Sequence, residues 1–167
     1  MARETVRIEG LDTLLDRLRR LGPEASKRGG PVRRAVRKGA VIIANEAKAN
    51  VRQIVATPNV SGHDESTGTL EKSIRPVRGK PNRNGLKGET FFVMIPKRAR
   101  YPISKRTPTG MPVAMVGRML EYGTAKRRPH RWMGPAFHAK KGEAVQVMTD
   151  DVLKGIEALE KKLGMGG

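Results

Sequence analysis

The chain has 167 residues, with 34 lysines and arginines against 16 aspartates and glutamates, a formal net charge of +18 at pH 7. Self-repulsion at this charge opposes compaction, so we expect an anionic partner, which would be DNA, RNA or an acidic protein surface. The sequence has no cysteine, which excludes disulfides and thiolate metal sites.

The length and the apolar content predict a single domain, residues 1–167, with a thin core. Apolar residues are 37% of the sequence and aromatic residues only 4%, so the core must be aliphatic, and subunit contacts would add to the burial. No apolar run approaches the ~18 residues of a membrane-spanning helix. The start of the chain also lacks a hydrophobic signal region, so we expect no membrane contact and a protein that stays in the cytoplasm where it is made.

The first elements are predicted from apolar periodicity. Polar and apolar residues alternate over residues 4–9, which predicts a short strand that ends at Gly10. Leucines at three- and four-residue spacing predict a helix over residues 11–21. A second helix is predicted from Pro31 to about Arg52, and its basic face is more typical of a solvated surface than of a DNA contact. The expected buried residues of this second helix are Val32, Ala35, Val36, Ala40, Ile43, Ala47 and Val51.

The middle of the chain predicts loops around one short helix and a hairpin. Residues 53–66 are rich in turn formers and predict a mobile loop. Thr69 is predicted to cap a single helical turn that carries Leu70 and Ile74 inward. The remaining segments are an extended one that opens at residues 76–77, a hairpin connection over 79–88 and a buried strand over 89–96.

A basic loop and a helix are predicted next. Residues 97–112 are rich in proline and cations, so no regular element fits them and we expect a mobile loop. A helix follows over residues 113–122, with Val116, Met119 and Leu120 directed inward.

The C-terminal part predicts the longest helix of the chain. Apolar residues spaced by three or four run from about Pro135 to Leu163, and a frayed tail follows over residues 164–167. The predicted fold class is therefore α+β, with a small antiparallel sheet flanked by three or four helices and a long amphipathic helix at the C-terminus.

The connection between the last two helices has its own pattern. Gly123 suits the left-handed position just past a helix end, where a Cβ would cost energy. Gly134 and Pro135 predict a cap residue followed by a proline in the first helical turn. Taken by itself, this pattern is most often structural punctuation.

The same connection carries a resemblance to a known family. Glu121-Tyr122-Gly123-Thr124, the basic Lys126-Arg127-Arg128 loop, Pro129 and Pro135-Ala136-Phe137 precede the amphipathic C-terminal helix, and Gly10-Leu11 and residues 67–75 match earlier in the chain. This pattern resembles the tail-completion, or head–tail joining, family of long-tailed double-stranded DNA bacteriophages, over residues 4–163. The chain departs from many relatives at residues 130–133, His-Arg-Trp-Met, where they have a Pro-Phe-Leu type of sequence.

The resemblance implies a non-enzymatic structural protein of the virion neck. Such a protein assembles, after synthesis in the host cytoplasm, as a homo-oligomeric ring, for which we expect six-fold symmetry, where the tail joins the DNA-filled head. Its expected partners are neighbouring neck and tail-tube proteins and, without sequence specificity, the genomic DNA that passes through the channel. Tail completion, head closure and tail-tube termination all use small ring-forming proteins, so the choice between these roles stays open.

The resemblance also suggests which surfaces make contacts. We expect a channel or docking surface and a set of subunit contacts. The docking residues are Arg98, Arg100, Lys105 and Arg106, and the subunit contacts are Glu121, Tyr122, Gly123, Thr124, Arg127, Arg128 and Trp132.

Catalytic and metal-binding patterns were sought as well. His63, Asp64 and Glu65 are adjacent in a polar loop, but adjacent side chains in a loop do not converge on one ion. His130 and His138 have an irregular spacing across a proline, which is typical of surface or interface groups. The chain has no phosphate-binding loop and no nucleophile elbow. We therefore expect no catalytic residue, no metal and no cofactor.

The alternative function is a cytoplasmic, basic nucleic-acid-binding protein. A charge of +18 guarantees some attraction to nucleic acid at low salt, because each neutralised phosphate releases counterions. Few aromatic residues are present to stack on bases, and no zinc finger, basic zipper or convincing helix-turn-helix is apparent. This alternative therefore predicts contacts with the phosphate backbone.

Overall fold

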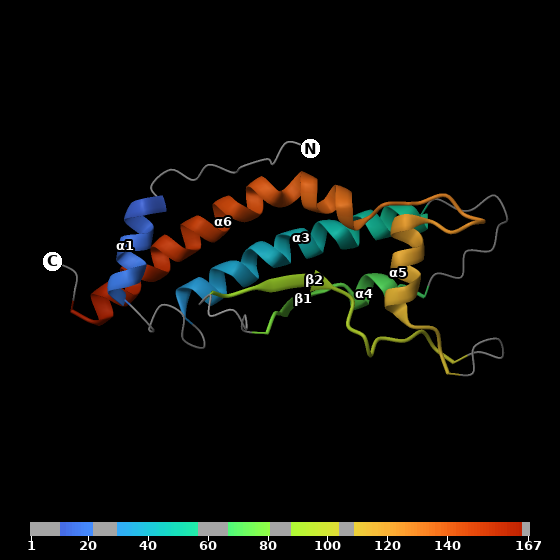
Figure 1. Ribbon diagram of the computed structural model, residues 1–167, viewed down its shortest axis with the longest axis horizontal. Helices are drawn as coiled ribbons and strands as arrows, with labels where there is room; N and C mark the ends of the chain where they lie inside the picture. The colour runs from blue at the N-terminus through green and yellow to red at the C-terminus, as the bar shows by residue number, and fades with distance from the viewer. Residues whose placement is uncertain (1–10, 22–29, 57–66, 81–87, 104–108, 165–167) are drawn as a thin grey trace. The chain divides into compact units, whose positions relative to one another are not determined.

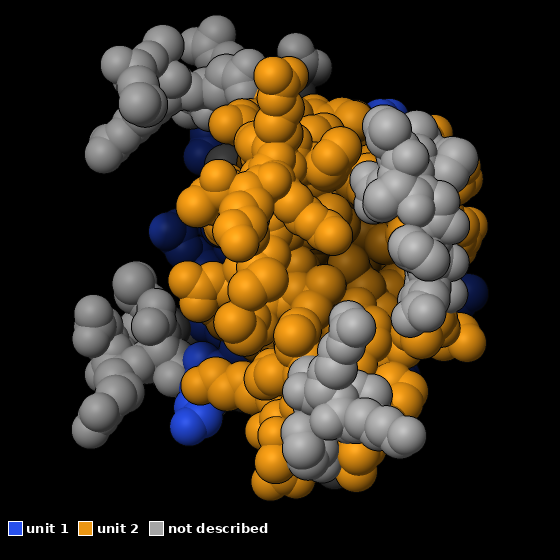
Figure 2. Space-filling view, turned by 90° about the vertical axis from the view of Figure 1, so that its right-hand side faces the viewer, with its two compact units in different colours: residues 1–39, 78–91, 142–167 blue, residues 40–77, 92–141 orange. Residues whose placement is uncertain are grey.

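The computed structural model describes residues 11–21, 30–56, 67–80, 88–103 and 109–164. The chain divides into two compact units, which Figure 2 distinguishes by colour. Unit 1 consists of residues 1–39, 78–91 and 142–167, and unit 2 of residues 40–77 and 92–141. The prediction of a single domain stays a prediction.

Five helices and a small two-stranded antiparallel sheet make up the described part of the chain, which confirms the α+β class and the long C-terminal helix (Figure 1). In chain order they are α1 (Leu11–Leu21), α3 (Pro31–Ala56), α4 (Thr69–Ser73), β1 (Arg75–Arg78), β2 (Phe91–Met94), α5 (Val113–Tyr122) and α6 (Met133–Lys162). None of the helices in these ranges is long and apolar enough to cross a membrane.

Unit 1 has a small aliphatic core. Its buried residues are Leu21, Ala35, Val152 and Ile156, with Leu18, Val32, Leu153 and Leu159 packed against them. Arg17 of α1 donates two hydrogen bonds to Glu160 of α6, from Nε to Oε1 at 3.1 Å and from Nη2 to Oε2 at 2.5 Å. The hydrogen bond from Arg17 lowers the pKa of the Glu160 carboxyl group, so the pair favours the charged forms that hold α1 on α6.

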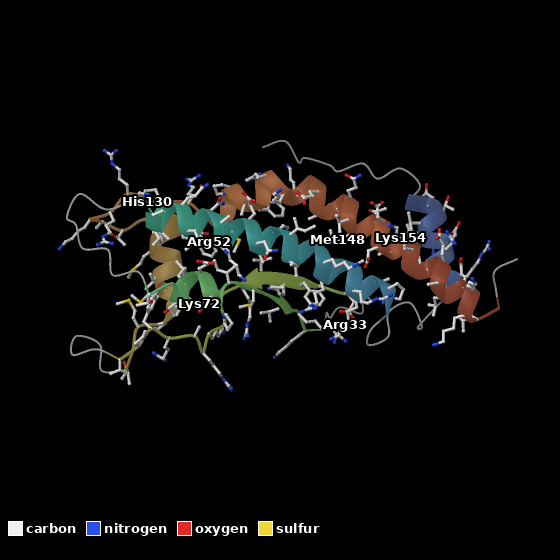
Figure 3. The ribbon with its side chains drawn as sticks, turned by 180° about the vertical axis from the view of Figure 1, so that it is seen from behind. Arg33, Arg52, Lys72, His130, Met148 and Lys154 are labelled. Carbon is white, nitrogen blue, oxygen red and sulfur yellow. The ribbon has the colours of Figure 1, made fainter. Side chains whose placement is uncertain are left out.

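Unit 2 contains the larger core, and small residues of α3 form one wall of it. The buried residues of this core are Ala44, Ala47, Val51, Leu70, Ile74, Val113, Trp132 and Ala136. Arg52 of α3, which Figure 3 labels, also donates from Nε to Oε1 of Glu71 in α4, at 2.6 Å. The helices predicted over residues 11–21 and 113–122 have the expected bounds, and Leu70 and Ile74 are buried as predicted.

Several predicted boundaries were wrong. Helix α3 continues to Ala56, so residues 53–56 are helical and not part of the predicted loop 53–66. Ile54 and Val55 pack against the core of unit 2, which favours continuing the helix. Gly68, with a φ of 65°, occupies the N-cap of α4, so Thr69 does not cap it.

The expected burial was wrong at some apolar residues. Phe92 is 55% exposed, so β2 is not the buried strand that was predicted. Successive side chains of a strand point to opposite faces, so Phe92 and Val93 face in opposite directions, and of these two only Val93 packs against the core. Met119, predicted to face inward, is 38% exposed.

Other predictions fall outside the described residues. These are the strand over residues 4–9, residues 57–66 of the first loop with the His63 cluster, most of the hairpin connection over 79–88, and Lys105 and Arg106.

The core of unit 2 yields a stability prediction. Ile74 is fully buried, so Ile74→Ala should lower the free energy of unfolding by about 2–5 kcal/mol, through lost burial and the cavity left behind. Ile103 is 75% exposed, so the same substitution there should change stability by less than about 0.5 kcal/mol. Urea unfolding of the two variants, followed by circular dichroism, tests this, and equal losses would contradict the assigned core.

Candidate functional site

The most organised polar arrangement in the described part of unit 2 lies where α5 ends and α6 begins. Glu121, in the last turn of α5, accepts hydrogen bonds at Oε2 from the backbone N–H groups of Trp132 and Met133, both at 2.8 Å. Its Oε1 accepts from the N–H of Gly134 at 3.0 Å. The first N–H groups of a helix have no acceptor within the helix, and Pro135, the next residue, has no N–H. Glu121 therefore caps α6 from a different helix, an arrangement called here the Glu121 cap.

The Glu121 cap is also favourable electrostatically. Partial burial by itself would raise the pKa of the Glu121 carboxyl group, but the three backbone hydrogen bonds and nearby Arg131 outweigh it and lower that pKa below its ordinary value of 4.5. The N-terminal end of a helix carries partial positive charge, which stabilises a carboxylate placed there. The ionised form of Glu121 is thus the form that this site selects.

Trp132 also holds the start of α6 against α5, with its side chain in the apolar core. Its indole is 5% exposed, and Nε1 donates to the carbonyl oxygen of Gly117 in α5 at 3.0 Å. Asn50 of α3 donates from Nδ2 to the carbonyl oxygen of Trp132, also at 3.0 Å. Trp132 therefore belongs to the chain's own core, and its side chain is not available for the subunit contact predicted for it.

The loop over residues 123–131 is tightly hydrogen-bonded. Thr124 and Arg127 pair through both backbone groups, with N···O distances of 2.9 and 3.2 Å, and the N–H of His130 donates to the carbonyl oxygen of Leu120 at 2.8 Å. Gly123 has a φ of 77°, and a Cβ there would lie 2.8 Å from the carbonyl oxygen of Arg127, so the predicted need for glycine is confirmed. This loop extends beyond the ends of α5 and α6 (Figure 1).

The loop presents the cations Lys126, Arg127, Arg128 and Arg131, which are all exposed. His130, which Figure 3 labels, is exposed on the same loop. None of Lys126, Arg127 and Arg128 forms an ion pair with a carboxylate of the described ranges. Their charges are therefore directed to solvent or to a partner.

The predicted docking loop is ordered at both ends. Arg98 and Arg100 are exposed, and Arg100 Nη1 donates to the carbonyl oxygen of Gly110 at 3.0 Å. The N–H of Tyr101 donates to Met111 at 2.9 Å, so the two ends of the loop over 97–112 are paired. Its mobility, and the docking role of Arg98 and Arg100, stay predictions.

A pocket of about 430 Å³ opens beside the Glu121 cap. The residues that line it are Glu121, Tyr122, Pro129, Arg131, Gly134, Pro135 and His138. Tyr122 is 78% exposed, and Met115 and Met119 lie on the same face of α5 with 47% and 38% exposure. Of the predicted subunit contacts, Glu121 and Tyr122 thus line this pocket, and Gly123 and Thr124 begin the loop.

The Glu121 carboxylate has a positioning role. Both oxygens of the Glu121 carboxylate already accept backbone hydrogen bonds, so the group holds α6 in place. No group of three or more histidine or acidic residues within the described ranges could hold a metal ion. The amino-acid sequence alone does not indicate the capping role, because Glu121 acts on residues as far as 13 positions ahead and no local capping motif has that spacing. Gly134 lies inside α6 and is not the predicted cap residue.

Comparisons with protein-family models, with curated proteins and with solved structures find no match for this chain. The resemblance to the tail-completion family therefore rests on the short motifs described above, chiefly those around Glu121.

The Glu121 cap yields a prediction on pH-dependent stability. Because the pKa of Glu121 is lower in the folded protein than in the unfolded chain, its stabilisation is complete above pH 4.5 and is lost as the pH falls below that value. Glu121→Gln should therefore cost about 1–2 kcal/mol near pH 7, and the difference from the wild type should shrink below pH 4.5.

Urea unfolding over a series of pH values measures this difference. Glu46→Gln is the matched control for loss of a carboxylate, because Glu46 forms no hydrogen bond or ion pair with the described residues. A Glu121→Gln effect that is the same at neutral and at acidic pH would contradict the cap.

Proposed function

We propose that this chain is a non-enzymatic structural protein of a bacteriophage neck, which forms a homo-oligomeric ring that completes the tail and joins it to the DNA-filled head. The sequence resemblance supports this proposal, and one structural observation carries it further. The residues that chiefly carry the resemblance lie between Glu121 and Phe137. In this segment the Glu121 carboxylate holds the start of α6, and the basic loop beside it is exposed. An exposed loop that is held in place in this way can contact a neighbouring protein or DNA.

The distribution of charge supports a role in an assembly. Residues 92–141 contain twelve lysines and arginines and one acidic residue, Glu121, so this stretch accounts for +11 of the net charge of +18. Glu121 is itself neutralised by the start of α6. In a ring, these cations have two uses, since DNA passes through the channel and anionic surfaces of neighbouring proteins dock against it.

The proposed contacts are assigned accordingly. Arg98 and Arg100, with Lys105 and Arg106, would face the channel or a neighbouring ring. The subunit contacts would involve the exposed Arg127 and Arg128.

The test is electron microscopy of a lysate from a phage in which a stop codon interrupts the gene for this chain. Filled heads beside separate tails of normal length are the expected result, because neither half needs the joining protein to form. Supplying the intact gene in trans should restore infectious particles, which controls for effects on neighbouring genes.

Other outcomes would contradict part or all of the proposal. Overlong tails would reassign the protein to tube termination, and heads that have lost their DNA would reassign it to head closure. Intact, infectious particles without the protein would reject the neck function.

The alternative function, a protein that binds the nucleic-acid backbone, is favoured by the same +11 stretch. The dependence of DNA affinity on salt concentration distinguishes dedicated nucleic-acid binding from attraction by net charge. A dedicated binder of duplex DNA should keep sub-micromolar affinity at about 150 mM salt, whereas attraction that comes from net charge alone should have collapsed by then. A fluorescence anisotropy titration of the purified chain with duplex DNA over a salt series distinguishes them.

A further inference from the structure

The pocket beside the Glu121 cap combines apolar side chains with nitrogen donors. Tyr122, Pro129 and Pro135 supply apolar surface, while Arg131 and His138 supply nitrogen donors. The Glu121 carboxylate also lines the pocket, but its oxygens already accept three backbone hydrogen bonds. A volume of about 430 Å³ lies within the range of binding pockets and can accept a large side chain.

An exposed apolar face leads to this pocket along α5. Met115, Met119 and Tyr122 are spaced by four and three residues, so they share one face of the helix. Their exposed fractions are 47%, 38% and 78%, and Phe137 at the start of α6 is 50% exposed. Methionine and aromatic residues gathered on a surface are typical of protein–protein interfaces, where they act as anchors.

The charges around this face select the partner. Arg118 is exposed on α5, and Lys126, Arg127 and Arg128 are exposed on the loop that follows. Glu121 is the one carboxylate in residues 92–141, and the start of α6 already neutralises it. A complementary partner therefore carries carboxylates around an apolar or aromatic side chain.

We propose that the pocket beside the Glu121 cap and the exposed face of α5 form a docking site for an acidic segment of another protein, with an aromatic or large apolar side chain of that segment in the pocket. A phosphate backbone has no apolar group to cover Met115, Met119 and Tyr122, so nucleic acid matches these observations less well. The same face on a second copy of this chain is equally basic, so the face does not complement itself. The inference rests on the proposed function in naming a neighbouring protein of an assembly as the occupant.

The test uses the purified full-length chain and a fluorescein-labelled synthetic peptide of aspartates and glutamates with one central phenylalanine. A second peptide has alanine in place of the phenylalanine, and a labelled DNA duplex is the third probe. At about 150 mM salt, the phenylalanine peptide should bind more tightly than the alanine peptide by about tenfold or more, because only it fills the pocket.

Variants locate the binding. Tyr122→Ala should lower the affinity for the phenylalanine peptide by about 10- to 30-fold. It should leave the affinity for DNA unchanged, because the substitution removes no charge. Tyr122→Phe should retain the affinity, since the ring is kept. Phe92→Ala, at another exposed aromatic residue, is the matched control and should have no effect. Tyr122 is so exposed that neither of its variants should disturb folding, which circular dichroism checks.

Four results would overturn the docking site. Equal affinities for the two peptides, or no effect of Tyr122→Ala, would reduce the binding to net charge. Loss of DNA affinity in Tyr122→Ala would assign the pocket to nucleic acid. Self-association in sedimentation that depends on Tyr122, without peptide binding, would assign it to a second copy. All of these measurements use purified protein. A negative result would therefore reject the docking site without bearing on the neck function, which is tested in a lysate.

Discussion

The hydrogen bonds between Glu121 and the start of α6 are the constraint on which the functional end of unit 2 depends. A carboxylate near the C-terminal end of its own helix is unfavourable, because the helix dipole is negative there. The positive end of α6 reverses that penalty, and Pro135 removes the next N–H that would need an acceptor. A carboxylate at the end of α5 and unpaired N–H groups at the start of α6 would each be unfavourable alone. Together they stabilise one another.

The same constraint organises the surface. Two hydrogen bonds of Trp132 join the start of α6 to α5: its backbone N–H donates to Glu121, and its indole donates to the carbonyl oxygen of Gly117. The end of the loop is therefore held against the helix from which the loop starts. The loop can then present its arginines and lysine in a defined arrangement, beside the ring of Tyr122. Preorganised groups lose less conformational entropy on binding than a disordered basic tail would, which favours a specific partner.

Apolar spacing was sufficient to predict α1 and α5, and the α+β class followed from the order of the elements. The Glu121 cap could not be predicted in this way, because it joins residues that local motifs do not relate. Trp132 was expected at a subunit contact, since a lone aromatic residue in a basic loop gives no sign of the core that receives it. Met119 has helical spacing typical of a core residue but lies on a face that the described chain leaves exposed.

Amide hydrogen exchange, resolved by NMR, tests the central claim most directly. The backbone amides of Trp132, Met133 and Gly134 should exchange slowly in the wild type, because Glu121 accepts from all three. In Glu121→Gln these three amides should exchange faster together, while that of Ala144, in the middle of α6, stays protected. Equal exchange at the three amides in both proteins would show that the carboxylate does not hold the helix, and the account built on it would fail.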